Sequence, residues 1–144
     1  MKAIVPYLNF DGQAEEAMQF YQSVLGGKFA GAGIIHMGDV PGMPDLSAEE
    51  QRRVMHVTLD LGNGLKLMAS DILPSMGHQL TVGNHCYMLL SPDSREEADR
   101  IFQALAEGGE VEMPMQDQFW GDYFGSLKDK FGVGWMINYS QTAS

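Results

Sequence analysis

The sequence has a single cysteine, few basic residues and no long apolar run. One cysteine among 144 residues excludes an internal disulfide and a zinc site built from cysteines, and it fits a reducing compartment. No stretch approaches the roughly 20 apolar residues that cross a bilayer. Asn9 and Asp11 interrupt the N-terminal apolar segment too early for a signal peptide. We therefore expect a cytoplasmic protein.

Positive charge is also scarce. Nine Lys and Arg residues face 19 Asp and Glu residues, which gives a formal net charge of −10. A field of this sign repels polyanions, so neither nucleic acid nor an anionic membrane is expected as a partner. The hydrophobic content of 44% is enough for one domain with a core of its own.

One segment of the chain occurs twice. Residues 14–29 read AEEAMQFYQSVLGGKF, and residues 95–111 read REEADRIFQALAEGGEV, so that Glu-Glu-Ala, a glutamine and a closing Gly-Gly recur. A repeat of this length in so short a chain is typical of one supersecondary unit used twice. We expect a single domain made of two repeat modules, residues 1–76 and residues 77–144.

Each module is predicted to contain a strand, a helix and three further strands, which is an α+β fold. In module one the predicted elements are strand 3–10, helix 13–25, a glycine-interrupted strand 28–37, and strands 54–61 and 65–71 joined by an Asn63-Gly64 hairpin. In module two they are strand 84–91, helix 94–107 opened by Asp93, and strands near 111–115, 122–128 and 134–140. The polar segment 38–53 contains Ser47-x-x-Glu50, which predicts a short capped helical turn.

Alternation along the strands predicts one apolar face covered by the helix and an opposite face of mixed composition. In strand 54–61, Met55, Val57 and Leu59 alternate with polar residues and are assigned to the apolar face. Aromatic rings and thioethers with a few polar groups are typical of small-molecule pockets. The predicted ligand-binding residues, which include one loop tryptophan, are Tyr7, Asn9, His56, Met68, His85, Tyr87, Trp120, Met136 and Asn138. Trp120 is either a loop aromatic over the sheet edge or a stacking wall for a planar ligand.

Two signatures carry a family resemblance. They are Pro6-Tyr7-Leu8-Asn9-Phe10 before AEEAMQFYQSVLGG, and FWGDYFGSLKDKFGVGWMIN at residues 119–138. With them the chain resembles the PhnB-like branch of the vicinal oxygen chelate superfamily, the group of glyoxalases, bleomycin-resistance proteins and extradiol dioxygenases. The resemblance implies paired βαβββ modules whose curved mixed sheets enclose a cavity, and it implies a homodimer. Some members of the branch carry the name of ubiquinone methyltransferases, but this sequence has no glycine-rich loop between strand and helix for S-adenosylmethionine.

Metal-dependent members of the superfamily hold their ion at four symmetric positions. The resemblance places these positions at Val5, Met68, His85 and Met136. Of these four side chains only that of His85 can bind a hard divalent ion, because thioethers are soft ligands and valine has no ligand atom. A catalytic metal site needs about three protein ligands, so one histidine is not enough. We therefore expect no catalytic metal and no cofactor; the alternative is a divalent ion bound by His56 and His85. His36 and His78 lie near loops and receive no functional role.

The leading hypothesis is a small-molecule-binding protein of the glyoxalase/bleomycin-resistance type, with a ligand that is aromatic or amphipathic and favoured when cationic. One alternative is a metal-dependent lyase, isomerase or dioxygenase that uses His56 and His85. Another is a metal-free enzyme in which either histidine acts as acid or base. The sequence does not decide whether the two modules pair within one chain or between two chains.

Overall fold

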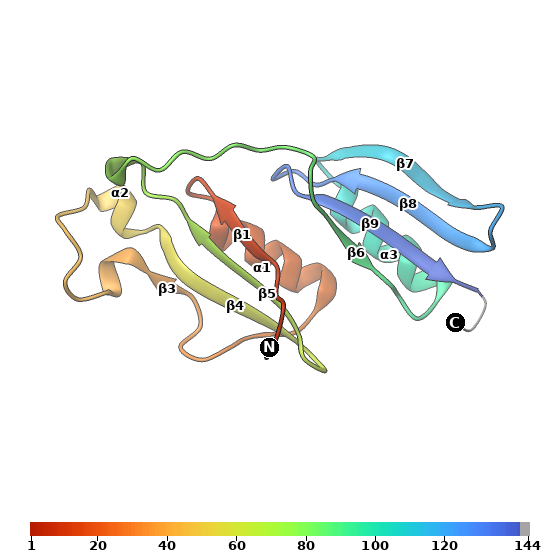
Figure 1. Ribbon diagram of the computed structural model, residues 1–144, viewed down its shortest axis with the longest axis horizontal. Helices are drawn as coiled ribbons and strands as arrows, with labels where there is room; N and C mark the ends of the chain where they lie inside the picture. The colour runs from red at the N-terminus through yellow and green to blue at the C-terminus, as the bar shows by residue number, and fades with distance from the viewer. Residues whose placement is uncertain (142–144) are drawn as a thin grey trace. The chain divides into compact units, whose positions relative to one another are not determined.

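Two units make up the computed structural model, which describes residues 1–141 (Figure 1). Unit 1 ends at Thr81 and unit 2 begins at Val82. Unit 1 contains β1 (Tyr7–Phe10), α1 (Ala14–Leu25), β2 (Lys28–Phe29), β3 (Ile35–His36), the 3-10 helix η1 (Met37–Asp39), α2 (Ala48–Gln51), β4 (Val54–Gly62), β5 (Leu65–Asp71) and the 3-10 helix η2 (Pro74–Met76). Unit 2 contains β6 (Tyr87–Leu90), α3 (Arg95–Ala106), β7 (Glu110–Asp117), β8 (Asp122–Lys128) and β9 (Gly134–Ser140). Within residues 1–141 no helix is long and apolar enough to span a membrane.

The sheets of the two units have the same strand order. It is β1-β5-β4-β2 in unit 1, where β3 also pairs with β4, and β6-β9-β8-β7 in unit 2. In each sheet the first strand runs parallel to the last strand of its unit, and the other pairs are antiparallel. The predicted α+β class with two mixed sheets is therefore confirmed. The enclosure of a cavity by these sheets stays a prediction.

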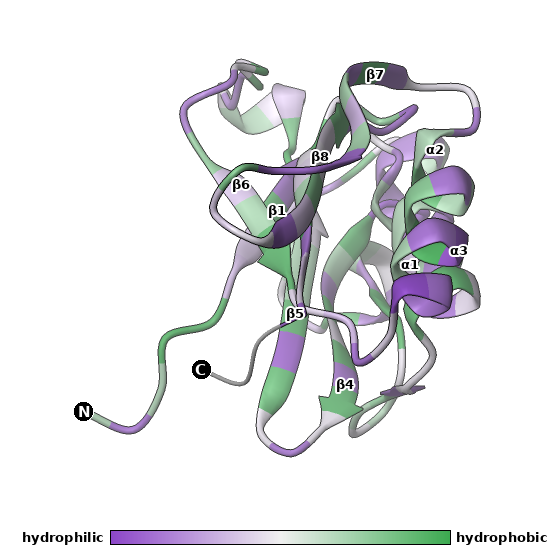
Figure 2. Ribbon diagram, turned by 90° about the vertical axis from the view of Figure 1, so that its right-hand side faces the viewer, coloured by the Kyte–Doolittle hydropathy of each residue, from purple (hydrophilic) through white to green (hydrophobic). Residues whose placement is uncertain are grey.

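One long helix covers one face of each sheet. Its apolar residues recur at helical spacing, which places them on the side of the helix that packs on the sheet. In unit 1 the buried residues of α1, which include Met18 and Tyr21, pack against β4 and β5. In unit 2 the buried residues of α3, which include Phe102 and Leu105, pack against β7, β8 and β9. In β5 every second residue from Leu67 to Asp71 is buried, so one face of this strand lies on the core. Figure 2 shows hydrophobic residues along β5 on both sides of a hydrophilic band. The opposite face of each sheet, here called the helix-free face, carries the predicted site residues other than His85 and Trp120, which lie outside the strands.

The two long helices begin in different ways. Asp71, buried at the end of β5, accepts hydrogen bonds from the backbone N–H groups of Gly12, Ala14 and Val54, at 2.8 to 3.0 Å. Its carboxylate thereby replaces the side-chain cap that α1 lacks. In α3 the hydroxyl of Ser94 accepts from the backbone of Glu97, which is a local cap. The predicted role of Asp93 as the opening residue is therefore wrong by one position.

The bounds of three predicted strands also need correction. The first strand begins at Tyr7 rather than at residue 3, and the strand of module two begins at Tyr87 rather than at residue 84. The single strand predicted for 28–37 is divided into β2 and β3, because Gly31 and Gly33 form a turn with positive φ.

A bulge in β4 reverses the predicted orientation of one residue. Ile35 pairs with His56 and His36 pairs with Val54, so Met55 has no partner in β3. Val54 is consequently buried, while Met55 is 41% exposed instead of facing the helix. Beyond the bulge the prediction is correct, since Val57 and Leu59 are fully buried.

Candidate functional site

On the helix-free face of unit 1, Tyr7, Met68 and Thr58 lie side by side on three neighbouring strands. Tyr7 of β1 is in register with Met68 of β5, and Met68 is in register with Thr58 of β4. Met68 is half-buried between its neighbours, whereas Asn9 is exposed. The adjacent strands therefore supply a phenol, a thioether and a hydroxyl in one row.

A network of side-chain hydrogen bonds crosses the same face. The Tyr7 hydroxyl lies 3.1 Å from Nδ1 of His56, and Nε2 of His56 lies 3.0 Å from Oγ1 of Thr58. The Tyr7 and His56 rings are 5.8 Å apart between centroids. Because both nitrogens of His56 have partners, its ring is fixed and its tautomer depends on which partner donates. These hydrogen bonds hold the two rings in place.

On the helix-free face of unit 2, the ring of Tyr87 lies across Gly134 of β9. A Cβ atom at Gly134 would be 2.8 Å from two atoms of that ring, so only glycine leaves room for it. The Tyr87 hydroxyl consequently reaches Glu112 of β7 and donates to its carboxylate, with both oxygens at 2.8 Å. Lys128 lies between them, with its ammonium 5.5 Å from the ring centroid and 2.6 Å from the carbonyl oxygen of Gly83.

The carboxylate also changes the acidity of this phenol. The hydrogen bond to Glu112 raises the pKa of Tyr87, because loss of the phenolic proton would place two negative charges side by side. Tyr87 is therefore a neutral hydrogen-bond donor near neutral pH, directed at a fixed acceptor.

Trp120 is attached to the same face through Asp122. The Trp120 indole N–H and the Asn138 side-chain amide both donate to Oδ2 of Asp122, each at 3.1 Å. Met136 pairs with Leu89 and Ser126 in the sheet and is half-buried. The structure thus connects Trp120 with Asn138, as the sequence could not show.

The predicted set divides between the two units. Tyr7, His56 and Met68 are neighbours in unit 1, and Trp120 and Asn138 share a carboxylate in unit 2. His85 precedes β6 and is exposed, so its predicted place on a strand is wrong. That these residues bind a ligand stays a prediction.

Glu112 and Asp122 belong to these clusters but were missed as ligand-binding candidates. The only available signal for Glu112 was the alternation of acidic and apolar residues in Glu110-Val111-Glu112-Met113.

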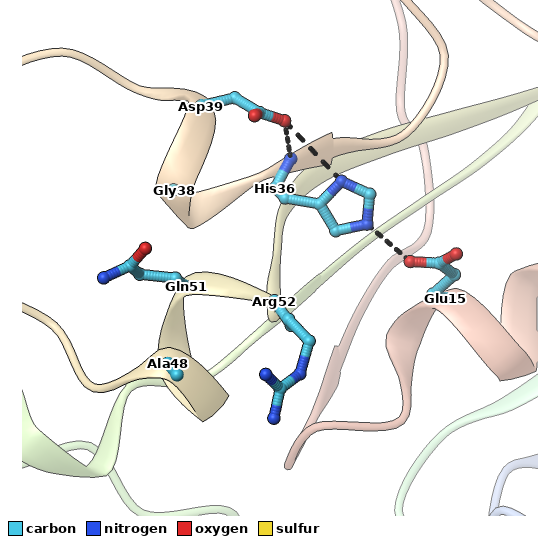
Figure 3. Close-up of a pocket in the computed structure, with 7 residues that line it drawn as sticks. All are labelled: Glu15, His36, Gly38, Asp39, Ala48, Gln51 and Arg52. Carbon is cyan, nitrogen blue, oxygen red and sulfur yellow. Dashed lines mark hydrogen bonds and ion pairs between the residues drawn. The ribbon is translucent and has the colours of Figure 1, made fainter.

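A pocket elsewhere in unit 1 is built around His36 (Figure 3). It is lined by Glu15, His36, Gly38, Asp39, Ala48, Gln51 and Arg52. Nε2 of His36 is 2.5 Å from the carboxylate of Glu15, and the same imidazole accepts from the backbone N–H of Asp39. Both ring nitrogens are thus occupied in fastening η1 to α1, which gives His36 a structural role.

The residues at the positions that the resemblance assigns to a metal ion do not together fit a divalent ion. Val5, Met68 and Met136 offer a hydrocarbon and two thioethers where a Lewis-acid ion needs imidazole or carboxylate ligands. Within each unit, over residues 1–141, no group of three or more His, Cys, Asp or Glu side chains is arranged to hold an ion. His56 and His85 belong to different units, so their joint coordination of a metal stays a hypothesis.

Residues 2–138 match the family model described as 3-demethylubiquinone-9 3-methyltransferase. The chain belongs to this family. It is similar to protein PA1353 from Pseudomonas aeruginosa, with 40% identity, a TM-score of 0.84, and 96% of this chain and 98% of that chain covered. It is also similar to the PhnB protein from Bacillus cereus, with 30% identity, a TM-score of 0.75 and coverage of 95% and 98%.

A more distant structure has the same fold. The glyoxylase/bleomycin resistance protein/dioxygenase domain from Frankia sp. EAN1pec is 12% identical, with a TM-score of 0.63 and coverage of 98% and 97%. The predicted membership in the PhnB-like branch of the vicinal oxygen chelate superfamily is thus confirmed.

The name of the family refers to a methyltransferase, but the connections between strand and helix lack the glycine-rich loop that would hold its cofactor. Residues 11–13, between β1 and α1, contain one glycine, and residues 91–94, between β6 and α3, contain none. A nucleotide-like cofactor is usually held at such a connection by several glycines. We therefore do not carry the methyltransferase activity over to this chain.

Proposed function

We propose that the chain binds a small organic molecule on its helix-free faces and holds no catalytic metal ion. The observation that carries the proposal is the fixed tyrosine on each face. Tyr7 is hydrogen-bonded to His56 and Tyr87 to Glu112, so each ring keeps its orientation before a ligand arrives. A ring held in advance loses little conformational freedom on binding, which favours affinity.

The half-buried methionines support the same proposal. Met68 lies next to Tyr7 in the sheet, and Met136 lies on the face that carries Asn138. Thioether side chains are polarisable and adapt to ligands of irregular shape. Rigid aromatic rings beside adaptable side chains, with a few polar groups to set orientation, are typical of small-molecule sites.

A thermal-shift screen of metabolites and antibiotics, followed by calorimetry of each hit, tests the proposal. Two double variants test the faces, Tyr7→Ala/Met68→Ala and Tyr87→Ala/Trp120→Ala. We expect each to lower the affinity for the ligands of its face about tenfold or more, since truncation of an aromatic anchor can cost over about 1 kcal/mol of binding free energy. Leu65→Ala, which removes an exposed apolar side chain at the β4–β5 hairpin, is the matched control and should bind normally. Normal binding of every hit to both double variants contradicts the proposal. So does a stoichiometric transition metal that is lost in His85→Ala.

A further inference from the structure

The turn between β7 and β8 exposes two aromatic rings that form a corner. Phe119 is 97% exposed and Trp120 is 54% exposed, which is unusual for large apolar side chains. Their ring centroids are 4.9 Å apart and their planes meet at 89°. We name these two residues, together with Asp122, the aromatic corner.

Hydrogen bonds fix the backbone and the indole of this corner. The backbone N–H of Gln118 donates to the carbonyl of Asp122 at 2.7 Å, and that of Gly121 donates to Gln118 at 3.0 Å. The Trp120 indole is held by Asp122, which is held in turn by Asn138 on the next strand. These hydrogen bonds orient the indole relative to the sheet.

The acidic residues on the two sides of the turn differ in how their charge is balanced. Arg95 donates two hydrogen bonds to the carboxylate of Asp117, at 2.8 and 2.9 Å, and neutralises it. Asp122 receives its hydrogen bonds from neutral groups, an indole and an amide. Within residues 1–141 no lysine or arginine forms an ion pair with Asp122. A negative charge without a counter-charge thus lies beside an exposed indole.

We propose that the aromatic corner is a subsite for a planar aromatic cation. The proposal rests on the proposed function and names the class of ligand for the helix-free face of unit 2. A flat ring gains contact area on the indole, and its positive charge is attracted both by the π-face and by Asp122. A neutral ring gains only the stacking contact, while an anion is repelled by Asp122 and by the net charge of −10.

Two acridines separate charge from shape. Proflavine is a planar cation at neutral pH, and acridine has the same three-ring frame but is neutral there. Calorimetry at moderate ionic strength should show that the intact chain binds proflavine about tenfold more tightly than acridine. Asp122→Asn should remove that difference and leave acridine binding unchanged, whereas Trp120→Ala should weaken both.

Glu96→Gln is the matched control for charge. It removes one negative charge from an exposed position on α3, on the other side of the same sheet, and should not change proflavine binding. Equal loss of proflavine affinity in Glu96→Gln and Asp122→Asn reveals attraction by net charge alone and overturns the proposal. No binding of proflavine by the intact chain also overturns it. If the chain forms a dimer that Phe119→Ser abolishes and that proflavine does not dissociate, the aromatic corner is an interface with a second copy. That result also overturns the proposal.

The subsite and the proposed function fail in different ways. If the screen finds ligands that respond to Tyr7→Ala/Met68→Ala while Trp120→Ala and Asp122→Asn have no effect on proflavine, the proposed function stands and the subsite is refuted.

Discussion

The tyrosines of the two helix-free faces start from similar places and reach different partners. Tyr7 is in register with Met68, whose side chain occupies the neighbouring position, and its hydroxyl reaches His56 on β4. Tyr87 is in register with Gly134, which has no side chain, and its hydroxyl reaches Glu112 on β7, one strand further across its sheet. The residue beside each ring therefore decides whether the phenol meets an imidazole or a carboxylate. One topology used twice has produced two chemically different faces.

A buried carboxylate fastens each unit, and its removal should have the largest effect. Asp71 accepts three backbone N–H groups, while Asp129 accepts those of Phe131 and Val133 and the indole N–H of Trp135. We expect Asp71→Ala and Asp129→Ala each to lower the free energy of unfolding by about 3 kcal/mol or more, since buried donors lose their acceptors. Urea titration measures this.

Asp45→Ala, at an exposed loop position, is the control for that comparison and should stay within about 0.5 kcal/mol of the parent. If either buried variant is too unstable to purify, Asp71→Asn and Asp129→Asn supply the graded comparison. If the variants of Asp71 and Asp129 lose no more free energy of unfolding than the control, these carboxylates do not fasten their units.

Gly134→Ala tests whether the missing side chain directs Tyr87. The new methyl group would lie 2.8 Å from the ring, so the ring or the strand must shift, and we expect a loss of about 1–3 kcal/mol. Gly83→Ala is the matched control, because a Cβ atom there meets nothing within 4 Å. Adding Tyr87→Ala to Gly134→Ala should relieve the clash. A double variant no more stable than Gly134→Ala alone would show that the ring is not the obstacle.

The acidity of Tyr87 gives a smaller, pH-dependent effect. Glu112 raises the pKa of Tyr87 in the folded chain above its unfolded value of about 10. The stability from this hydrogen bond is therefore complete below pH of about 10 and is lost as the pH rises through the folded pKa. Glu112→Gln should move the Tyr87 titration toward about pH 10, as followed by ultraviolet absorbance. Asp99→Asn, which acts on Tyr123 instead, should leave it in place.

The smallest effect is expected at the exposed pair of Asp117 and Arg95. The hydrogen bonds from Arg95 lower the pKa of Asp117. Their stability is present above the unfolded value of about 4 and is lost as the pH falls through the folded pKa. The urea midpoints of the parent and Asp117→Asn should differ slightly at neutral pH and coincide below about pH 2. A difference that persists in acid would refute the ion pair as its source.

Local patterns were enough to predict much of the fold. Apolar spacing located α1 and α3 to within a residue or two, and Asn63-Gly64 marked a turn in which both residues have positive φ. Ser47 caps α2 through the backbone of Glu50, as the spacing predicted. Each of these features depends on residues that are close in sequence.

The errors arise where one strand depends on another. Met55 is exposed because β3 pairs with β4 around it, and Tyr87 reaches Glu112 because Gly134 lies between them in the sheet. The structural role of His36 could not be predicted either, because its partner Glu15 lies on another element. Register and reach across a sheet are set by tertiary packing, which periodicity along one strand does not contain.

The cap of α1 has a consequence for how the chain is made. The ribosome releases this helix early, but Asp71, which accepts the N–H groups at its start, emerges only with the last strand of the unit. Until then the nascent helix is left without its acceptor and should fray. In the second half Ser94 emerges just ahead of the helix that it caps, so that helix can form as soon as it is synthesised.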